Sequence, residues 1–111
     1  MYKDIQIGSK TVGMAANALS PYLFKQVFRS DFLKEVQKET PDEDLFVKMG
    51  FIFAKQAELK TISDLTRLNE QNFYDWLQDF EPLDVLLASG EISGLYYTQA
   101  ESSSVPKNEA G

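Results

Sequence analysis

The chain has 111 residues, of which 43% are hydrophobic and 13% aromatic, so it is long enough to fold as one domain with a modest core. Its 17 acidic and 11 basic residues give a net charge of −6, which argues against binding to the phosphate backbone of nucleic acids. The lack of cysteine and histidine excludes disulfides and thiolate zinc sites, and it removes the commonest general base.

No segment of the sequence approaches the roughly 20 consecutive apolar residues that a membrane-spanning helix needs. The first ten residues, "MYKDIQIGSK", alternate polar and apolar side chains and lack the apolar run of a signal peptide. We therefore expect a protein that acts in the cytoplasm and does not bind membranes.

A β-hairpin is predicted over residues 1–14. Gly8 and Ser9 favour a tight turn, and polar and apolar residues alternate around it, with apolar side chains at Ile5, Ile7, Val12 and Met14. Because an isolated hairpin is marginally stable, it must pack on helices of its own chain or pair with another chain through an edge strand. We favour packing on its own helices.

The stretch "SPYLFKQVFRSDFLKEV" predicts two short amphipathic helices in series. Ser20 and Pro21 are typical of a helix start, and Asp31 is typical of the residue that caps a second helix. Helical spacing gathers the apolar side chains on one side of each helix: Leu23, Phe24, Val27 and Phe28 in the first, and Phe32, Leu33 and Val36 in the second. These faces have to be covered, either by the core or by a partner.

A long helix is predicted over residues 40–60. Thr40 and Glu43 have the spacing of a capping box, with Pro41 at the first helical position. From residue 45 to residue 57 the segment is apolar on almost every side, which is typical of a buried helix. Since so short a chain can hardly surround such a helix, we expect a homo-oligomer.

The second half of the chain predicts more helices. Ser63 is expected to begin a short turn. Phe73, Trp76, Leu77 and Phe80 have the spacing of an amphipathic helix, and Pro82 begins a last helix weakened by Gly90 and Gly94. The polar residues 99–111 are expected to form a disordered tail after a single domain at residues 1–98. The predicted fold is therefore mainly α, a bundle of five or six helices with an N-terminal hairpin.

The residues that carry catalytic or metal chemistry form no convincing pattern. The acidic cluster Asp75, Asp79, Glu81 and Asp84 does not have the spacing of a calcium loop, and helical periodicity places its first two members on a solvated face. The sequence contains neither of the two glycine-rich nucleotide-binding motifs, G-x-x-x-x-G-K-[ST] and G-x-G-x-x-G. We expect no enzymatic activity, no cofactor and no metal.

The order of elements resembles the tail assembly chaperones of long-tailed phages and prophages of Gram-positive bacteria. The resemblance covers roughly residues 3–97 and rests on "NALSPYLFKQVFRSDF", on "AKQAELKTISDL" and on "NFYDWLQDFEPLDVL". Members of this family often carry a glycine after the position of Phe28, where this chain has Arg29, which leaves open how the turn is built here.

The resemblance implies a small helical protein of the host cytoplasm that is absent from the finished virion. Its partner would be the tape measure protein, a long and largely helical chain that it keeps soluble until tail tube subunits polymerise. A longer product made by ribosomal frameshifting would recruit the tail tube protein. Such chaperones have no catalytic site.

Candidate partner-binding residues are the apolar side chains of the predicted amphipathic helices: Leu23, Phe24, Val27, Phe28, Phe32, Phe51 and Trp76. The sequence does not decide whether they form the core or a groove for a helical client. The main alternative function is a structural virion component, such as a head–tail connector or a tail terminator. A small regulatory adaptor is a third possibility.

Overall fold

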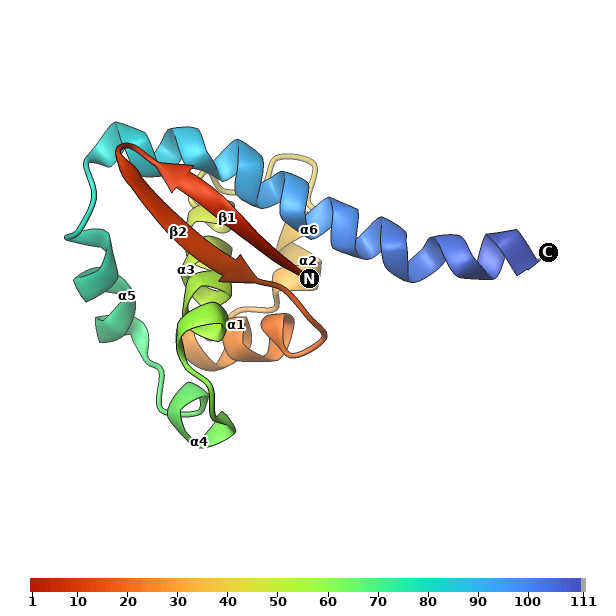
Figure 1. The fold of residues 1–111 in the computed structure, drawn as a ribbon, viewed down its shortest axis with the longest axis horizontal. Helices are drawn as coiled ribbons and strands as arrows, with labels where there is room; N and C mark the ends of the chain where they lie inside the picture. Colours follow the sequence, from red (N-terminus) through yellow and green to blue (C-terminus); the bar gives the residue numbers. More distant parts are fainter. Residues whose placement is uncertain (111) are drawn as a thin grey trace.

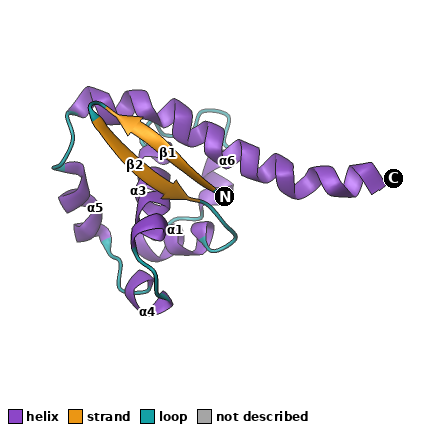
Figure 2. Cartoon of the chain, viewed as in Figure 1, coloured by secondary structure: helices purple, strands orange, loops and turns teal. Residues whose placement is uncertain are grey.

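The computed structural model describes the backbone of residues 1–110 and the side chains of residues 1–98. This part of the chain forms two strands and six helices: β1 Tyr2–Ile7, β2 Lys10–Ala15, α1 Ser20–Phe28, α2 Phe32–Val36, α3 Leu45–Glu58, α4 Ile62–Leu65, α5 Glu70–Leu77 and α6 Pro82–Ala110. The hairpin lies across one side of the molecule, and α6 runs beside it before its C-terminal half extends away from the other elements (Figure 1). The predicted fold, mostly helical with an N-terminal hairpin, is confirmed (Figure 2).

The hairpin packs on the helices of its own chain. Strands β1 and β2 pair in antiparallel register with Ile5 opposite Val12, and Gly8 takes the positive φ of 63° that the tight turn requires. The side chains of Ile5, Ile7 and Met14 are fully buried, because β2 packs on α3 and β1 packs on α6. The expected packing of the hairpin on helices of its own chain is therefore observed.

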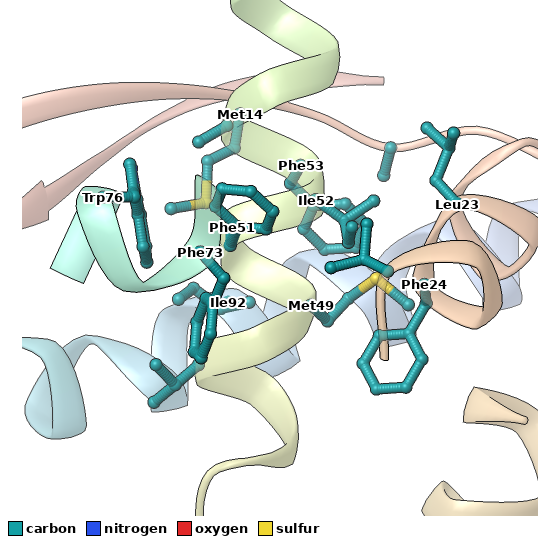
Figure 3. Close-up of a cluster of buried hydrophobic side chains, with 14 of the residues drawn as sticks. Met14, Leu23, Phe24, Met49, Phe51, Ile52, Phe53, Phe73, Trp76 and Ile92 are labelled. Carbon is teal, nitrogen blue, oxygen red and sulfur yellow. The ribbon is translucent and has the colours of Figure 1, made fainter. Parts of the chain in front are cut away.

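Helix α3 is the centre of the core. It packs against β2, α1, α5 and α6, and it buries eight residues: Leu45, Val47, Met49, Gly50, Phe51, Ile52, Phe53 and Ala54. Figure 3 shows Phe73 and Trp76 of α5 on one side of α3 and Leu23 and Phe24 of α1 on the other. One protomer thus covers a helix that is apolar nearly all round, so the burial of α3 gives no reason to invoke a second copy.

Aromatic rings connect the helices through a continuous series of edge contacts. The ring centroid of Phe51 in α3 lies 5.5 Å from that of Phe73 and 5.7 Å from that of Trp76. The ring centroids of Phe28 in α1 and Phe73 are 5.0 Å apart. At the opposite end of the core, Phe32 lies 5.0 Å from Tyr96 of α6. Such pairs stabilise a fold beyond the area that they bury. The heavy aromatic content of the sequence is therefore used largely inside the protomer.

The start of α1 differs from the prediction. Ser20 does not cap the helix with its side chain; instead it lies inside the first turn, 3% exposed, and its hydroxyl donates to Gln56 Oε1 of α3 at 2.5 Å. Gln56 Nε2 in turn donates to Asn17 Oδ1 at 2.8 Å, and the same oxygen accepts from the amide of Leu19 at 2.9 Å. A tertiary polar network takes the place of a local cap.

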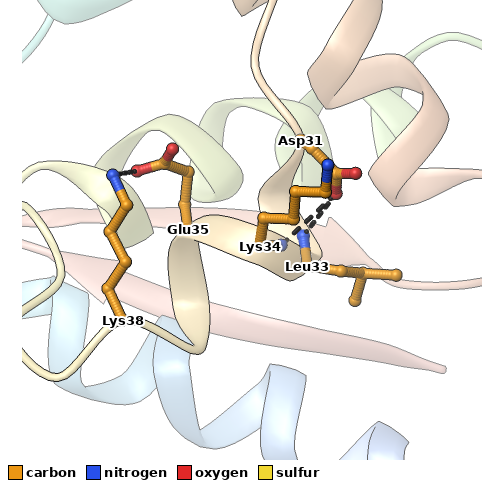
Figure 4. A network of polar contacts seen from close by, with 5 residues as sticks. All are labelled: Asp31, Leu33, Lys34, Glu35 and Lys38. Atoms are coloured by element: carbon orange, nitrogen blue, oxygen red, sulfur yellow. Dashed lines mark hydrogen bonds and ion pairs between the residues drawn. The ribbon is translucent and has the colours of Figure 1, made fainter.

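The junction between α1 and α2 is built from two backbone devices. Arg29 ends α1 in the left-handed conformation, with φ 57° and ψ 32°, and its amide donates to the Lys25 carbonyl. Asp31 then caps α2 as predicted, since its Oδ1 accepts from the amides of Leu33 at 3.0 Å and Lys34 at 3.3 Å (Figure 4). Arg29 therefore adopts the conformation that glycine takes most readily at a helix end.

The predicted start of the long helix is wrong by five residues. Helix α3 begins at Leu45 after Asp44, whose side chain caps nothing, and the expected capping box of Thr40 and Glu43 does not form. Residues 37–44 are all exposed, so no packing supports a further helical turn. Local capping signals are too weak to extend a helix beyond its buried face.

The remaining helices begin at local caps or at proline. Thr61, rather than Ser63, caps α4, and Asn69 forms a reciprocal capping box with Asn72 at the start of α5. Helix α6 begins at Pro82 as predicted and continues through Gly90 and Gly94. Its backbone is helical to Ala110, whereas the side chains from residue 99 and all of Gly111 lie outside the described residues. The disordered tail at residues 99–111 therefore stays a prediction.

No helix in the described part of the chain combines the length and the apolar character that a membrane span requires.

Candidate partner-binding surface

The seven partner-binding residues predicted from the sequence lie in the core rather than on a surface. Phe28 is partly buried, and the others are at most 8% exposed: Leu23, Phe24, Val27, Phe32, Phe51 and Trp76. A partner cannot reach these side chains unless the helices separate. A surface that binds a partner has to be sought among the apolar groups that remain exposed.

Helix α6 presents a second apolar face that points away from the core. Three leucines within its first two turns are strongly exposed: Leu83 at 69%, Leu86 at 45% and Leu87 at 77%. Gly90, Gly94 and Tyr97 follow them at helical spacing and lie on the same side of the helix. We call these six residues the α6 outer face. The opposite side of the helix carries the buried residues Val85, Ala88, Ile92 and Leu95.

An apolar groove adjoins the α6 outer face. It lies where α5 and the start of α6 meet α3, has a volume of about 440 Å³, and is lined mainly by apolar side chains: Val47, Phe73, Tyr74, Leu77, Phe80, Pro82, Val85 and Leu86, with Asp44 and Glu81. We call it the α5–α6 groove. Tyr74 and Leu86 are both about half exposed, and Leu86 belongs to the groove and to the α6 outer face. The two features therefore form one continuous apolar surface.

The electrostatics of this surface are acidic. Residues 68–98, which include α5 and the described side chains of α6, contain no lysine or arginine and six acids: Glu70, Asp75, Asp79, Glu81, Asp84 and Glu91. Four basic side chains approach from other elements. Lys10 donates to the Asp79 carbonyl at 2.7 Å, Lys48 lies 3.5 Å from Asp44, and Lys55 and Arg67 line a hollow with Asp75 and Asp79. Within residues 1–98, Glu81, Asp84 and Glu91 form no ion pair.

Comparison with protein-family models, curated proteins and solved structures finds no match to this chain. The resemblance to tail assembly chaperones rests on the residue pattern alone, and the function it implies remains a prediction.

The acidic cluster predicted from the sequence is spread over the surface of the described part of the chain. Asp75, Asp79 and Glu81 are exposed, and no group of three acids comes together in a way that could hold a metal ion within that part. A polar hollow of about 530 Å³ near Asp75 and Asp79 also contains Lys55 and Arg67, so its walls carry both signs of charge. These acids contribute negative charge to the exposed surface of α5 and the start of α6.

The far end of the α6 outer face adjoins a tyrosine pair. The rings of Tyr96 and Tyr97 lie 5.1 Å apart, and Tyr96 packs against Phe32 while Tyr97 is about half exposed. Burial, with a smaller contribution from Tyr97, raises the pKa of Tyr96 above its ordinary value. The Tyr96 ring, packed edge-on against Phe32, joins this part of α6 to α2.

The signal for this surface was present in the sequence but lay in the angular distribution of the last helix. Between residues 83 and 97 the apolar residues divide into two groups on opposite sides of a helix, whereas a helix that only packs on a core needs one. Counting apolar residues in this segment merges the two groups. Plotting them at 100° per residue separates Leu83 and Leu87 from Val85 and Ile92.

Proposed function

We propose that this protein is a phage tail assembly chaperone that binds the tape measure protein and keeps it soluble until the tail tube forms around it. The protein would work in the host cytoplasm, would have no catalytic activity and would be absent from the finished virion. A longer frameshifted product that recruits the tail tube protein belongs to the same proposal. The residue pattern of residues 3–97 is the source of this assignment.

The observation that supports the proposal most directly is the exposed apolar surface formed by the α6 outer face and the α5–α6 groove. A chaperone for a helical client needs apolar groups that are accessible without unfolding, and Leu83, Leu86 and Leu87 meet that requirement. Single exposed apolar residues are common on any protein, but three leucines within two turns beside an apolar groove are not. The negative charge of the chain would keep the free chaperone soluble.

Co-expression with the tape measure protein tests the proposal. The tape measure protein is the long coiled-coil chain that we expect to be encoded beside this gene, and it should move from the insoluble to the soluble fraction when this protein is present. Proteomics of purified particles should find the tape measure protein but not this chain. Recovery of the chain in stoichiometric amounts from particles would instead favour a connector or a tail terminator.

Self-association stays a prediction with a different basis from the one that the sequence suggested. Helix α3 is covered within the protomer, and we expect the contact instead at the outer edges of the two-stranded sheet β1–β2. Sedimentation over a concentration series would detect such an oligomer. A monomer at all concentrations would remove this part of the proposal and leave client binding intact.

A further inference from the structure

Gly90 and Gly94 lie on the α6 outer face without any packing role inside the protomer. A Cβ placed on either residue meets no atom within 4 Å among the described residues, whereas a Cβ on Gly50 would meet Ile92. Glycine weakens the interior of a helix relative to alanine, so its presence at two such positions has no explanation in the fold of one chain. A residue without a side chain does, however, let a second helix approach the backbone closely.

We propose that the α6 outer face and the α5–α6 groove together bind a cationic amphipathic helix, with apolar residues at helical spacing and lysine or arginine on both flanks. This inference rests on the proposed function, because it states the chemistry of the client segment that the chaperone recognises. The apolar residues of the bound helix would fill the groove and contact Leu83 and Leu87. Its backbone would cross α6 at Gly90 and Gly94.

The charge of the surface determines the choice of occupant. Glu81 lies at the groove, as does Asp44 with its partner Lys48, and Glu91 lies along one side of the α6 outer face. The Asp84 carboxylate faces the hairpin turn at Gly8. A second copy of this chain would bring the same acids against one another, and like charges across an interface oppose association. An anionic membrane surface is disfavoured for the same reason. A helix with basic flanks is complementary to both the apolar and the acidic parts.

The geometry of the surface favours a helix over an extended strand. Leu83, Leu87, Gly90, Gly94 and Tyr97 follow one side of α6 over 15 residues, whose ends are about 21 Å apart at the rise of an α-helix. Side chains at this spacing form a ridge with gaps at the glycines, and a second helix packs against such a surface by fitting its own ridge into the gaps. The unpaired backbone groups that a strand would need are not available on a helix, since α6 uses them internally.

The experiment compares two synthetic helices on the full-length protein. Both peptides have about 20 residues, alanine at neutral positions and leucine at i, i+3, i+4 and i+7 spacing. One carries lysine on the flanks, and the other carries glutamate at the same positions. Isothermal titration calorimetry at low and high salt is expected to show at least tenfold tighter binding of the lysine peptide at low salt, with a smaller difference at high salt.

Two variants locate the binding surface. Leu83→Ser with Leu87→Ser removes exposed apolar groups, and Gly90→Leu with Gly94→Leu fills the gap in the ridge. Both pairs should weaken binding of the lysine peptide at least tenfold. Because these positions are exposed, circular dichroism and thermal melting should show that the fold is kept. The matched control is Tyr22→Ser on α1, where a side chain that is 72% exposed is removed without effect on binding.

The outcomes separate this inference from the proposed function. Equal binding of the two peptides, or unchanged binding in both double variants, overturns the inference. So does a dimer that the Leu83→Ser and Leu87→Ser changes dissolve, because a second copy would then be the occupant. If the wild-type protein and the leucine double variant both solubilise the tape measure protein, the proposed function stands and the inference fails. If the lysine peptide binds at α6 but the tape measure protein stays insoluble, only the proposed client is wrong.

Discussion

Gly50 of α3 lies directly against Ile92 of α6, so closely that a Cβ at Gly50 would be 2.6 Å from Ile92 Cδ1. Both residues are buried, and Ile92 is 0% exposed. This contact lets α3 and α6 approach each other in the middle of the core, and it differs from the environment of Gly90 on the same helix α6.

The same substitution at these two glycines is therefore expected to have opposite effects. Gly90→Ala should raise the free energy of unfolding by up to about 1 kcal/mol, because alanine favours the helix and the new methyl group meets nothing. At Gly50 the same gain is opposed by overpacking that costs about 1–3 kcal/mol, so Gly50→Ala should destabilise the protein. Urea unfolding of both variants measures the difference. Equal effects at the two positions would show that α3 and α6 are not packed in this way.

Phe53→Ala is expected to lower the free energy of unfolding by about 3–5 kcal/mol. The side chain is 1% exposed in the centre of α3, so its removal leaves a cavity that the packed core can only partly close. Leu87→Ala is the control, because that side chain is 77% exposed and should change stability by less than about 0.5 kcal/mol. A small loss for Phe53→Ala in denaturant titration would place Phe53 outside the core.

Arg29→Gly is expected to stabilise the protein by about 1 kcal/mol. Among the described residues, Arg29 is the one non-glycine residue whose φ is positive. A side chain in this left-handed backbone conformation carries a steric cost that glycine lacks. The Arg29 amide would still donate to the Lys25 carbonyl. Thermal melting checks the prediction, with Arg29→Ala as the control that keeps the Cβ. A lower melting temperature for the glycine variant would count against the left-handed turn.

Asp31→Ala should destabilise the protein by about 1 kcal/mol, since the amides of Leu33 and Lys34 lose the carboxylate that accepts from them. Asp44→Ala is the matched comparison. Asp44 also precedes a helix, but its side chain caps nothing, and its contact with Lys48 is a surface ion pair worth about 0.5 kcal/mol or less. If chemical denaturation shows that Asp31→Ala lowers the free energy of unfolding no more than Asp44→Ala does, the Asp31 cap of α2 contributes nothing.

The stability of the protein should fall at alkaline pH in part through Tyr96. Burial raises the pKa of Tyr96 in the folded state, so the folded state favours the neutral phenol. The stabilisation is fully present below the unfolded pKa of about 10 and is lost as the pH rises through the higher folded pKa. Tyr96→Phe should therefore make the unfolding free energy less dependent on pH above about 10. An unaltered alkaline profile in Tyr96→Phe would refute this role.

The elements that the sequence predicted well are those where a local signal and a buried face agree. Asp31 precedes an apolar stripe that packs on the core, and Pro82 precedes one as well, so both helices begin where expected. Thr40 has an equally good local signal, but nothing covers residues 37–44, and the helix begins only at Leu45. Ser20 lies next to Gln56, which is 36 residues away in the chain, and no local pattern reveals that contact.

The candidate surface was missed because hydrophobicity alone does not say which side of a helix is covered. Phe51 and Trp76 are residue types that often anchor interfaces, yet both are buried. Leu83 and Leu87 are a residue type that usually lies in the core, yet both are exposed. The distinction depends on α3 and β1, which both pack on α6, and Ile92 lies on the side that faces Gly50 of α3. The packing of α3 and the hairpin on α6 decides which of its apolar sides remains open.

The uneven distribution of charge along the chain has a kinetic consequence. Residues 1–67 contain ten basic and nine acidic residues, whereas residues 68–98 contain six acids and no base. The molecule therefore carries a permanent electric dipole whose negative end coincides with α5 and the start of α6. In the electric field of a positively charged chain, the protein would rotate so that its negative end faces that chain before any contact forms. Encounters would then begin with the leucines of the α6 outer face already turned toward the partner. Such pre-orientation raises the association rate, and added salt suppresses it.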